Sequence, residues 1–596
     1  MSQPSQDNSI DPITFEVLRN AFKSVVNEMN LALSRSAHTP CITEGEDHCA
    51  AVFDAQGNLI MQGDTDLPIF IGIIEFPCKA VVEKYGPGGI NPGDVIMTNS
   101  AFAGGSHIND IIVMRPLFYE GELIGFTSAI GHWTDVGGSQ PGSIVPGALE
   151  YFEEGVLYPP IKIIEAGRLN QPVLDIIMAN CRTPEATQGD LEAQIASLAT
   201  GEDRILSLID KYGWARIKSF MTVVQERSEA MLRAKIAELP DGVYAFEDRS
   251  DYDTPTNPEP ILIKLSMIVA GETITFDFTG SSPQSRSSSN ATLGITTSGV
   301  LVVTKCMFPD IPMNHGIFKA LRIIAPTGTV VNAQPPAAIS GAFATILEKV
   351  VGTALGAFAQ ILPADVIACP YNMVNISLGG YDLRTNNSYV MYIYSEGGLG
   401  ARAALDGVSG VVSLFGGSTK FPPVEVLEKR YPILFTGWGF EQDSGGPGAY
   451  RGGVGSKKFL KITADQAQLM VLGDRGKYPP FGLAGGMPGA TQRLEVVRAD
   501  GTKHNLDVKI SGFKLYQGDE VRFYSSGGGG YGDPLEREPA RVLADVQLGM
   551  VSEERGRTDY GVVLKGRPLV VDACQTEYER RTRRDHRVSG IGRSDV

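Results

Sequence analysis

The stretch GGSHINDIIVMRPLFYEGELIGFTSAIGHWTD, residues 104–135, is the part of the sequence that says most about the fold. Glycine and proline divide it into short strands, and the passage from Asp110 to His132 has the pattern of a strand, a turn and a second strand. In such a passage the second strand runs back beside the first, so we expect its two ends, Asp110 and His132, to lie close together. Loops that are held on a rigid β framework are a common place for chemistry.

Helical and β patterns alternate irregularly on both sides of this stretch. Asp11 suits an N-cap and Pro12 suits the first turn of a helix whose apolar residues recur at helical spacing. Residues 183–239 predict two helices that are separated at Gly213, and residues 261–280 predict a hairpin. The sequence therefore predicts a mixed α/β (α+β) multi-unit fold with several mixed sheets and a β-rich C-terminal part.

The composition is that of a folded, acidic, globular protein. Of the 596 residues, 43% are apolar and 20% are charged, and the formal net charge is −16. The apolar fraction is large enough to bury a core, and the low charge content argues against global disorder. A protein that binds nucleic acid or an anionic membrane needs a basic face, so the acidic balance argues against both kinds of partner.

Several observations favour a cytoplasmic location. The first residues, MSQPSQDNSIDP, have neither the basic region nor the apolar core of a signal peptide. No apolar run reaches the length of about 18 residues that a membrane span needs. The 7 cysteines are scattered and form no CxxC pair. That pattern is typical of reduced thiols and argues against a zinc site made of cysteines.

His107, Asp110 and His132 form the strongest candidate site. Two imidazoles and a carboxylate offer mixed nitrogen and oxygen ligands, which suit zinc, manganese, iron or cobalt. We expect a further ligand from the acidic loop 44–47, Glu44-Gly45-Glu46-Asp47. Open coordination positions would make this a catalytic rather than a structural site. The alternative is that these histidines only form hydrogen bonds, because a His-x-x-Asp spacing also arises by chance.

Other motifs give weaker indications. His315 follows the loop MFPDIPMN and is a candidate to contact substrate, although a histidine that stabilises a turn fits the same pattern. Four aromatic residues are candidates to line a cleft, namely Phe70, Trp133, Trp438 and Tyr478, but an aromatic residue is more often part of the core. The glycine-rich segments 451–458 and 525–533 do not match the phosphate-binding pattern G-x-x-x-x-G-K-[ST], so we expect tight turns there.

At these motifs the sequence resembles hydantoinase B, the smaller subunit type of the hydantoinase/5-oxoprolinase/acetone carboxylase family. The resemblance extends over most of the chain, from about Asp11 to Leu564. The motifs that carry it are GGSHINDIIV (104–113), HWTDVGGSQPGS (132–143), FPDIPMNHG (308–316), PPVEVLEKRYPI (422–433), DSGGPGAYRGGVG (443–455) and SSGGGGYGDPLERE (525–538).

The resemblance implies a hetero-oligomer of two kinds of subunit. Such a subunit works with a larger hydantoinase A-type subunit, which binds ATP with Mg²⁺ in an actin-like fold. ATP then drives the hydrolysis of a cyclic amide, such as a hydantoin, 5-oxoproline or a lactam. The alternative is the ATP-dependent carboxylation of a ketone, such as acetone or acetophenone. We therefore expect an ATP-dependent amidohydrolase, with a ketone carboxylase as the alternative, and we expect the ATP site on the partner.

The resemblance also implies roles for individual residues. The metal site of the family corresponds to His107, Asp110 and His132, and its acidic ligand corresponds to Asp47. Asp135 becomes a candidate general base or a hydrogen-bond partner of a metal-bound histidine. Phosphorylation of the amide oxygen would make the amide a better electrophile, and a water activated by the metal would then attack it.

The sequence departs from the family pattern at three places. Ser100 and Trp133 stand where many relatives have aspartate and histidine, and the segment SGAFATILEK (340–349) lacks the more polar pattern of the family. These differences lie in loops that we expect to face the substrate, and they leave the substrate and the reaction branch open.

The chain is expected to divide into five parts. They are an N-terminal metal-site α/β region (1–182), a helical segment (183–255), a central α/β region (256–448), a β-rich C-terminal region (449–570) and a flexible tail (571–596).

Overall fold

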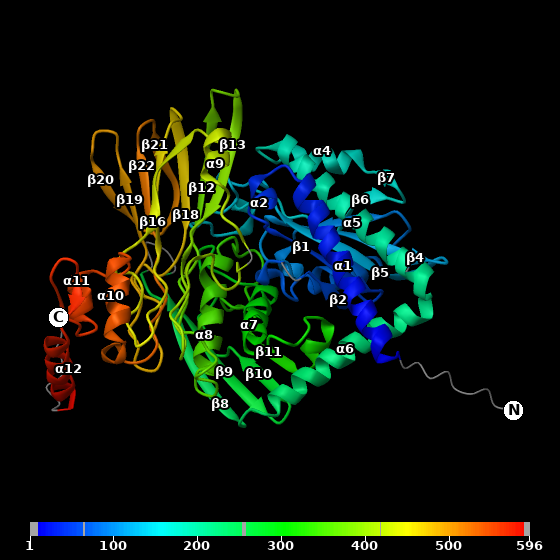
Figure 1. The fold of residues 1–596 in the computed structure, drawn as a ribbon. Helices are drawn as coiled ribbons and strands as arrows, with labels where there is room; N and C mark the ends of the chain where they lie inside the picture. The colour runs from blue at the N-terminus through cyan, green and yellow to red at the C-terminus, as the bar shows by residue number, and fades with distance from the viewer. Residues whose placement is uncertain (1–9, 64–65, 87, 253–257, 418, 589–596) are drawn as a thin grey trace.

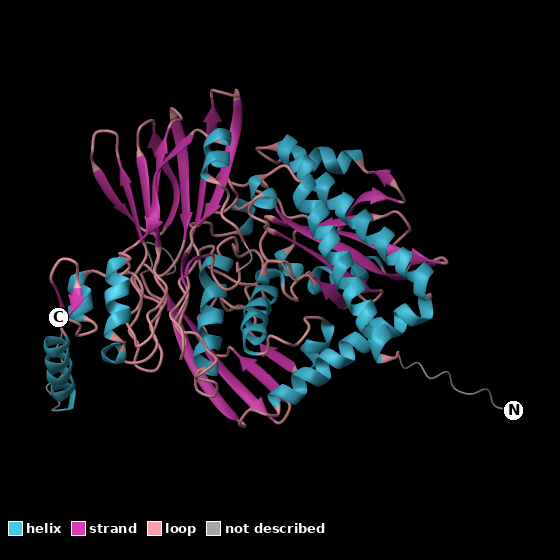
Figure 2. Ribbon diagram, in the orientation of Figure 1, coloured by secondary structure: helices cyan, strands magenta, loops and turns pink. Residues whose placement is uncertain are grey.

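The computed structural model describes residues 10–63, 66–86, 88–252, 258–417 and 419–588 (Figure 1). Helices and several separate sheets alternate along these residues, which confirms the predicted mixed α+β fold (Figure 2). No described helix combines the length and the apolar character that crossing a membrane requires.

A seven-stranded antiparallel sheet forms the N-terminal part, in the order β2-β1-β5-β4-β3-β6-β7. Strands β4 and β5 form the long hairpin that the sequence predicts, and Asp110 pairs directly with His132. The predicted proximity of Asp110 and His132 is therefore confirmed. The strands are β1 (His48–Asp54), β2 (Leu59–Gln62), β3 (Val95–Thr98), β4 (Asp110–Tyr119), β5 (Glu122–His132), β6 (Ile161–Glu165) and β7 (Arg168–Leu169).

The two faces of this sheet belong to different cores. Ile111 and Val113 lie in the core that α1 and α5 cover, whereas Ile112 and Met114 lie in a core shared with α3, α7 and α8. This alternation follows from the period of two in a strand. The helices are α1 (Pro12–Ser36), α3 (Glu75–Tyr85), α4 (Gln171–Ala179), α5 (Pro184–Tyr212), α6 (Trp214–Ile236), α7 (Leu293–Met307) and α8 (Glu348–Phe358).

The ends of the first helices are where local sequence signals place them. The Asp11 side chain accepts a hydrogen bond from the Thr14 N–H at 2.9 Å, as expected of an N-cap. Gly213 separates α5 from α6 with a φ of 85°, a conformation that favours glycine.

The second sheet has the order β11-β10-β9-β8 and packs against α8. The predicted hairpin is confirmed by β9 and β10, which meet at Ala270 and Gly271. A π-helical turn, Phe343–Leu347, leads directly into α8, and such turns are frequent at functional sites. The strands are β8 (Gly242–Ser250), β9 (Ile261–Ala270), β10 (Thr273–Asp277) and β11 (Leu321–Ile324).

Two further sheets enclose a third core in the C-terminal half. The first has the order β13-β12-β18-β21 and the second has the order β16-β17-β22-β19-β20. Figure 1 shows these strands side by side at the upper left. They are β12 (Asn375–Asp382), β13 (Asn387–Tyr394), β16 (Ile433–Phe440), β17 (Ser456–Ile462), β18 (Gln466–Leu472), β19 (Arg493–Val497), β20 (Lys503–Leu506), β21 (Lys509–Tyr516) and β22 (Glu520–Tyr524).

The glycine-rich segments are packed backbone to backbone instead of forming tight turns. The Gly528 N–H donates to the Gly453 carbonyl at 2.9 Å, and the Gly446 N–H donates to the Gly528 carbonyl at 2.8 Å. A Cβ atom on Gly452 would lie 2.0 Å from the Gly528 carbonyl oxygen, so only glycine permits this approach. Backbone N–H groups that would be needed to bind a phosphate thus already donate hydrogen bonds to backbone carbonyls.

The arginine-rich end of the chain, expected to be a flexible tail, forms helix α12 (Ala573–Val588), and residues 589–596 lie outside the described part. Arg580 is buried, and its guanidinium donates to the carbonyls of Tyr560 and Arg537 at 3.0 and 2.7 Å. These hydrogen bonds attach α12 to the segments that flank the two preceding helices, α10 (Pro539–Gln547) and α11 (Glu553–Thr558).

Candidate metal centre

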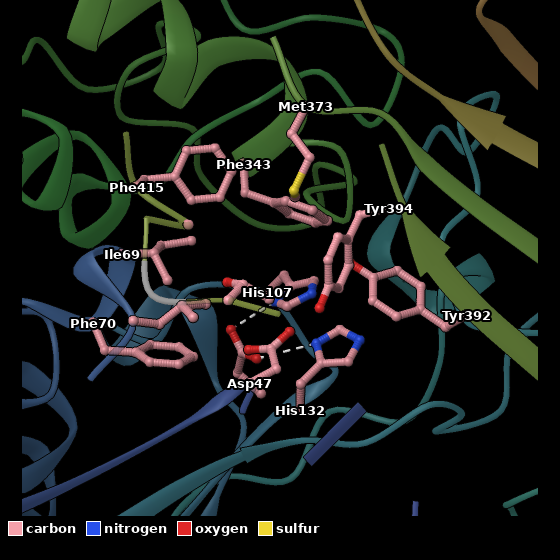
Figure 3. Close-up of a pocket in the computed structure, with 14 residues that line it drawn as sticks. Asp47, Ile69, Phe70, His107, His132, Phe343, Met373, Tyr392, Tyr394 and Phe415 are labelled. Atoms are coloured by element: carbon pink, nitrogen blue, oxygen red, sulfur yellow. Dashed lines mark hydrogen bonds and ion pairs between the residues drawn. The ribbon is translucent and has the colours of Figure 1, made fainter. Parts of the chain in front are cut away.

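The ends of three neighbouring strands bring four predicted site residues together. Asp110 is the first residue of β4, and His132, opposite it, is the last residue of β5. His107 lies in the turn that leads into β4, where the Asp110 N–H donates to the His107 carbonyl at 3.1 Å. Asp47 directly precedes β1, and its carbonyl accepts the His132 N–H at 3.2 Å. The side chains of these residues converge in one pocket (Figure 3).

The Asp110 carboxylate holds both imidazole rings. His107 Nδ1 lies 2.8 Å from one of its oxygens, and His132 Nδ1 lies 3.3 Å from the other. The three side chains each offer a ligand atom, and these atoms lie within 4.8 Å of one another. Donor atoms of different side chains are thus gathered around one small volume, as a metal site requires.

Each ring also keeps one nitrogen without a partner. Nε2 of His107 and Nε2 of His132 are buried, and neither finds a hydrogen bond among the described residues. A buried polar atom without a partner costs free energy, which a bound ion or ligand would recover. Imidazole nitrogen together with carboxylate oxygen is a donor set that suits zinc, manganese, iron or cobalt. The residues present therefore fit a divalent ion.

The electrostatics of the site also favour a cation. Burial alone would raise the pKa of Asp110, but the two adjacent imidazoles outweigh it and hold that pKa well below its usual range. Burial raises the pKa of Asp47 to about 6. For His132, burial would lower the pKa, but the hydrogen bond to Asp110 raises it. Both carboxylates are thus mainly ionised at neutral pH and bring negative charge to a buried site.

An apolar wall encloses the cluster. The Phe343 ring lies 4.6 Å from the His107 ring, and the Tyr392 ring lies 4.6 Å from the His132 ring (Figure 3). The enclosed cavity measures about 20 Å³, which is room for about one water molecule. A molecule larger than water does not fit this space unless side chains of the wall move. The wall is formed by Leu67, Ile69, Phe70, Phe343, Met373, Tyr392, Tyr394, Phe415, Gly416 and Thr419.

Two residues that the sequence suggested for substrate binding lie elsewhere. Trp133 is fully buried in the core under α1 and α5, where its indole N–H donates to Gln194 Oε1 at 3.1 Å. His315 Nδ1 lies 2.8 Å from Glu75 Oε1, next to α3. Neither belongs to the described residues that line the pocket.

Asp135 is also away from the cluster, in a loop that it holds together. One carboxylate oxygen accepts the N–H groups of Gly137 and Arg182 at 3.1 and 2.9 Å. The other accepts the Gly142 N–H at 3.1 Å and the Arg182 guanidinium at 2.9 Å. Asp135 is fully buried, and these four hydrogen-bond donors stabilise its buried carboxylate.

We therefore expect Asp135→Asn to change stability but not metal content. The amide nitrogen cannot accept a hydrogen bond, so a backbone N–H and the Arg182 guanidinium lose an acceptor, at a cost of about 1–3 kcal/mol. Thermal unfolding and metal analysis of the purified variant measure the two effects separately. Loss of metal at unchanged stability would instead connect Asp135 to the metal centre.

Several residues of the site are not indicated by the sequence pattern. Tyr392 and Tyr394 point to the same side of β13, and Phe343 lies in the π-helical turn, far from His107 in sequence. Cys41 places its thiol 3.6 Å from an Asp47 carboxylate oxygen. The one available signal is the departure of residues 340–349 from the family pattern, since this segment contains Phe343.

The fold and the site together define a class, namely mixed α+β proteins with a buried histidine and aspartate cluster in an apolar pocket. Residues 11–534 match the family described as hydantoinase B/oxoprolinase. The chain therefore belongs to the hydantoinase B/oxoprolinase family.

Individual relatives support this assignment. The B-type subunit of a putative D-/L-hydantoinase from Pseudomonas sp. (strain NS671) is 32% identical over 96% of this chain and 97% of its own length. The crystal structure of the ATP-dependent caprolactamase from Pseudomonas jessenii matches with a TM-score of 0.88 at 30% identity, over 96% of this chain and 100% of that chain. A nucleotide-free acetone carboxylase matches with a TM-score of 0.89 over 97% of this chain and 84% of that chain. Its 22% identity shows a common fold alone.

Proposed function

We propose that this chain is the metal-binding subunit of a cytoplasmic, ATP-dependent cyclic amide hydrolase. The observation that carries the proposal is the convergence of Asp47, His107, Asp110 and His132 in one enclosed pocket. The similarity to one subunit of a hydantoinase and to an ATP-dependent caprolactamase supports the reaction class. The partner is a hydantoinase A-type subunit that binds ATP with Mg²⁺, because a relative that is named as one of the subunits of a hydantoinase acts in a complex.

The reaction needs ATP because an unstrained amide is a poor electrophile. Transfer of the terminal phosphoryl group to the amide oxygen, on the partner, forms an imidate phosphate and ADP. One water molecule then adds to the carbon, and breakage of the ring C–N bond leaves a free amino group and an acyl phosphate. A second water molecule hydrolyses the acyl phosphate, which releases phosphate and yields the open-chain amino acid. A bound divalent ion would supply Lewis acidity and would lower the pKa of a water molecule.

The side chains of this subunit prepare the site for that chemistry. The Asp110 carboxylate orients both imidazoles through their Nδ1 atoms, so that the rings are fixed before substrate arrives. The rings of Phe343 and Tyr392 cover the imidazoles and exclude bulk water. Exclusion of water protects a reactive phosphorylated amide from loss to unproductive reactions.

The pocket wall also predicts the kind of substrate. Among the described lining residues there is neither a lysine nor an arginine, and most are apolar. A carboxylate buried against this apolar wall, out of reach of the divalent ion, would cost several kcal/mol. We therefore expect kcat/KM for an uncharged lactam, such as ε-caprolactam, to exceed that for 5-oxoproline by at least about 100-fold. Equal rates for both substrates would contradict this account of the wall.

Reconstitution tests the proposed function. The chain is co-expressed with its hydantoinase A-type partner, and ring-opened product and ADP are measured for lactams, hydantoins and 5-oxoproline, with the isolated chain as control. We expect ATP-dependent ring opening by the complex alone. Absence of product from every cyclic amide, in an assembled complex loaded with metal, would contradict the proposal.

Bicarbonate separates hydrolysis from the alternative, an ATP-dependent ketone carboxylase. A hydrolase consumes ATP with a lactam whether or not bicarbonate is present. A carboxylase consumes ATP with acetone or acetophenone only when bicarbonate is added, and it yields a carboxylated product. ATP turnover that requires both a ketone and bicarbonate would replace our proposal by this alternative.

A further inference from the structure

Cys41 is a buried thiol beside the metal centre. It lies in the short helix α2 (Pro40–Thr43), and its carbonyl accepts the Asp47 N–H at 3.1 Å. Its Sγ lies 3.6 Å from Asp47 Oδ2, at the distance of a weak S–H donor. The backbone contact fixes the loop 41–47, so the thiol and the carboxylate point to the same place.

A second observation connects this thiol to a ligand. Cys41, Asp47 and His132 each offer a ligand atom, and these atoms lie within 4.8 Å of one another. His132 is shared with the group of His107 and Asp110, and its buried Nε2 finds no partner among the described residues. The two groups share His132, so the thiol lies beside an imidazole that also belongs to the group of His107 and Asp110.

The spacing of sulfur and oxygen fits two ligands of one ion. Zinc binds thiolate sulfur at about 2.3 Å and carboxylate oxygen at about 2.0 Å, and two such ligands in tetrahedral geometry lie about 3.5 Å apart. The observed separation of Cys41 Sγ and Asp47 Oδ2 is 3.6 Å. The two side chains can therefore bind one ion without a large rearrangement.

We propose that Cys41 is a ligand of the divalent ion, together with Asp47 and His132. The inference rests on the proposed function, because it assigns a further ligand to the same site. On binding, the thiol releases its proton to solvent and the sulfur binds as a thiolate. Thiolate favours zinc, iron or cobalt over the hard ions manganese and magnesium. Cys41 thus determines which metal the enzyme uses.

Cys49 provides a matched control. It is equally buried, but its thiol donates to Asp66 Oδ2 at 3.1 Å, outside the pocket. Cys41→Ser and Cys49→Ser each replace one buried thiol by a hydroxyl. Only the first replacement touches the converging donors.

Cobalt substitution tests the inference. The full chain and both variants are loaded with Co²⁺, and their near-ultraviolet spectra are recorded, because a thiolate bound to cobalt gives a charge-transfer band. We expect the band in the wild type and in Cys49→Ser, and its loss in Cys41→Ser. Competition between zinc and manganese should shift toward manganese by at least about 10-fold in Cys41→Ser alone.

The outcomes separate this inference from the proposed function. If the wild type binds cobalt and opens lactams in the complex but shows no thiolate band, Cys41 only hydrogen-bonds to Asp47 and the inference is wrong. If the band persists in Cys41→Ser, another cysteine is the ligand and the inference is again wrong. If the chain binds no cobalt, zinc or manganese at all, both the inference and the metal-dependent function are wrong.

Discussion

Asp110→Ala is expected to lower kcat/KM for lactam hydrolysis by at least about 100-fold. Substitution of a residue that only supports a metal ligand typically costs about 10–100-fold, and Asp110 has two roles in the cluster. It offers a carboxylate to the site, and it holds the Nδ1 atoms of His107 and His132 at 2.8 and 3.3 Å. Without it both rings lose their orientation. Steady-state kinetics of the reconstituted complex, with metal analysis of the same samples, measure the effect.

The control for this variant must show that the protein still folds. Asp135→Asn, another buried aspartate close in sequence but outside the pocket, should keep its metal and most of its activity at moderate temperature. Asp110→Ala should still assemble with the partner and should give an ordinary circular dichroism spectrum. Activity within a few-fold of the wild type in a metal-free Asp110→Ala complex would refute the assigned role.

Arg475→Met is expected to destabilise the protein by about 3–5 kcal/mol. Arg475 is almost fully buried and forms two parallel hydrogen bonds with the Asp248 carboxylate, at 2.7 and 3.1 Å. Its Nε also donates to Asn372 at 2.9 Å. Asp248 belongs to β8 of the central sheet, whereas Arg475 follows β18 of the C-terminal sheets. Removal of the guanidinium leaves the carboxylate buried without its cationic partner.

Denaturant unfolding of the wild type and of three variants measures this effect. Arg567→Met serves as the control, because its ion pair with Glu553 is exposed and such pairs contribute at most about 1 kcal/mol. The double variant Asp248→Leu/Arg475→Met should recover much of the loss, since replacing both members of a buried pair by apolar groups is often neutral. A loss no larger in Arg475→Met than in Arg567→Met would show that the buried pair does not stabilise the assembly of the two sheets.

Three residues of the histidine and aspartate cluster could be predicted from the sequence because they lie in or next to one hairpin, namely His107, Asp110 and His132. The alternation of strand and turn between Asp110 and His132 places these residues opposite each other, and His107 lies three residues before Asp110, the first residue of β4. The residue pattern indicated only the acidic loop 44–47 as a source of a further ligand, and the choice of Asp47 within it followed from the resemblance to the family. No local pattern shows that β1 pairs with β5, which is the contact that brings Asp47 to the cluster.

Residues close to His132 in the sequence do not all lie close to its side chain in the structure, because β5 ends there. Trp133 directly follows His132, and successive residues along a strand point to opposite sides, whereas Asp135 lies three residues beyond the last residue of β5. Trp133 therefore enters the core under α5, and Asp135 turns toward the Arg182 loop. His315 was misplaced for a different reason, because its pairing with Glu75 is a contact between the 3₁₀ turn His315–Lys319 and α3, which lie far apart in the sequence.

Most of the pocket wall could not be predicted, since of the aromatic candidates to line a cleft only Phe70 belongs to it. Phe343, Met373, Tyr392 and Phe415 come from segments that follow the metal ligands by some two hundred residues or more, and each would be read locally as an ordinary core residue. Only the packing of the central and C-terminal sheets against the N-terminal sheet brings them over the imidazoles. The apolar character of the wall, and the substrate preference inferred from it, therefore depend on the tertiary structure.

The central claim is that the histidine and aspartate cluster binds a divalent ion. The most direct test is the metal content of the full chain, purified with zinc, manganese, iron or cobalt, dialysed, and compared with the His107→Ala/His132→Ala variant by mass spectrometry of the elements. The account predicts about one tightly held ion per wild-type chain and none in the variant, with both proteins folded. A wild-type chain that retains no more metal than the variant would contradict it.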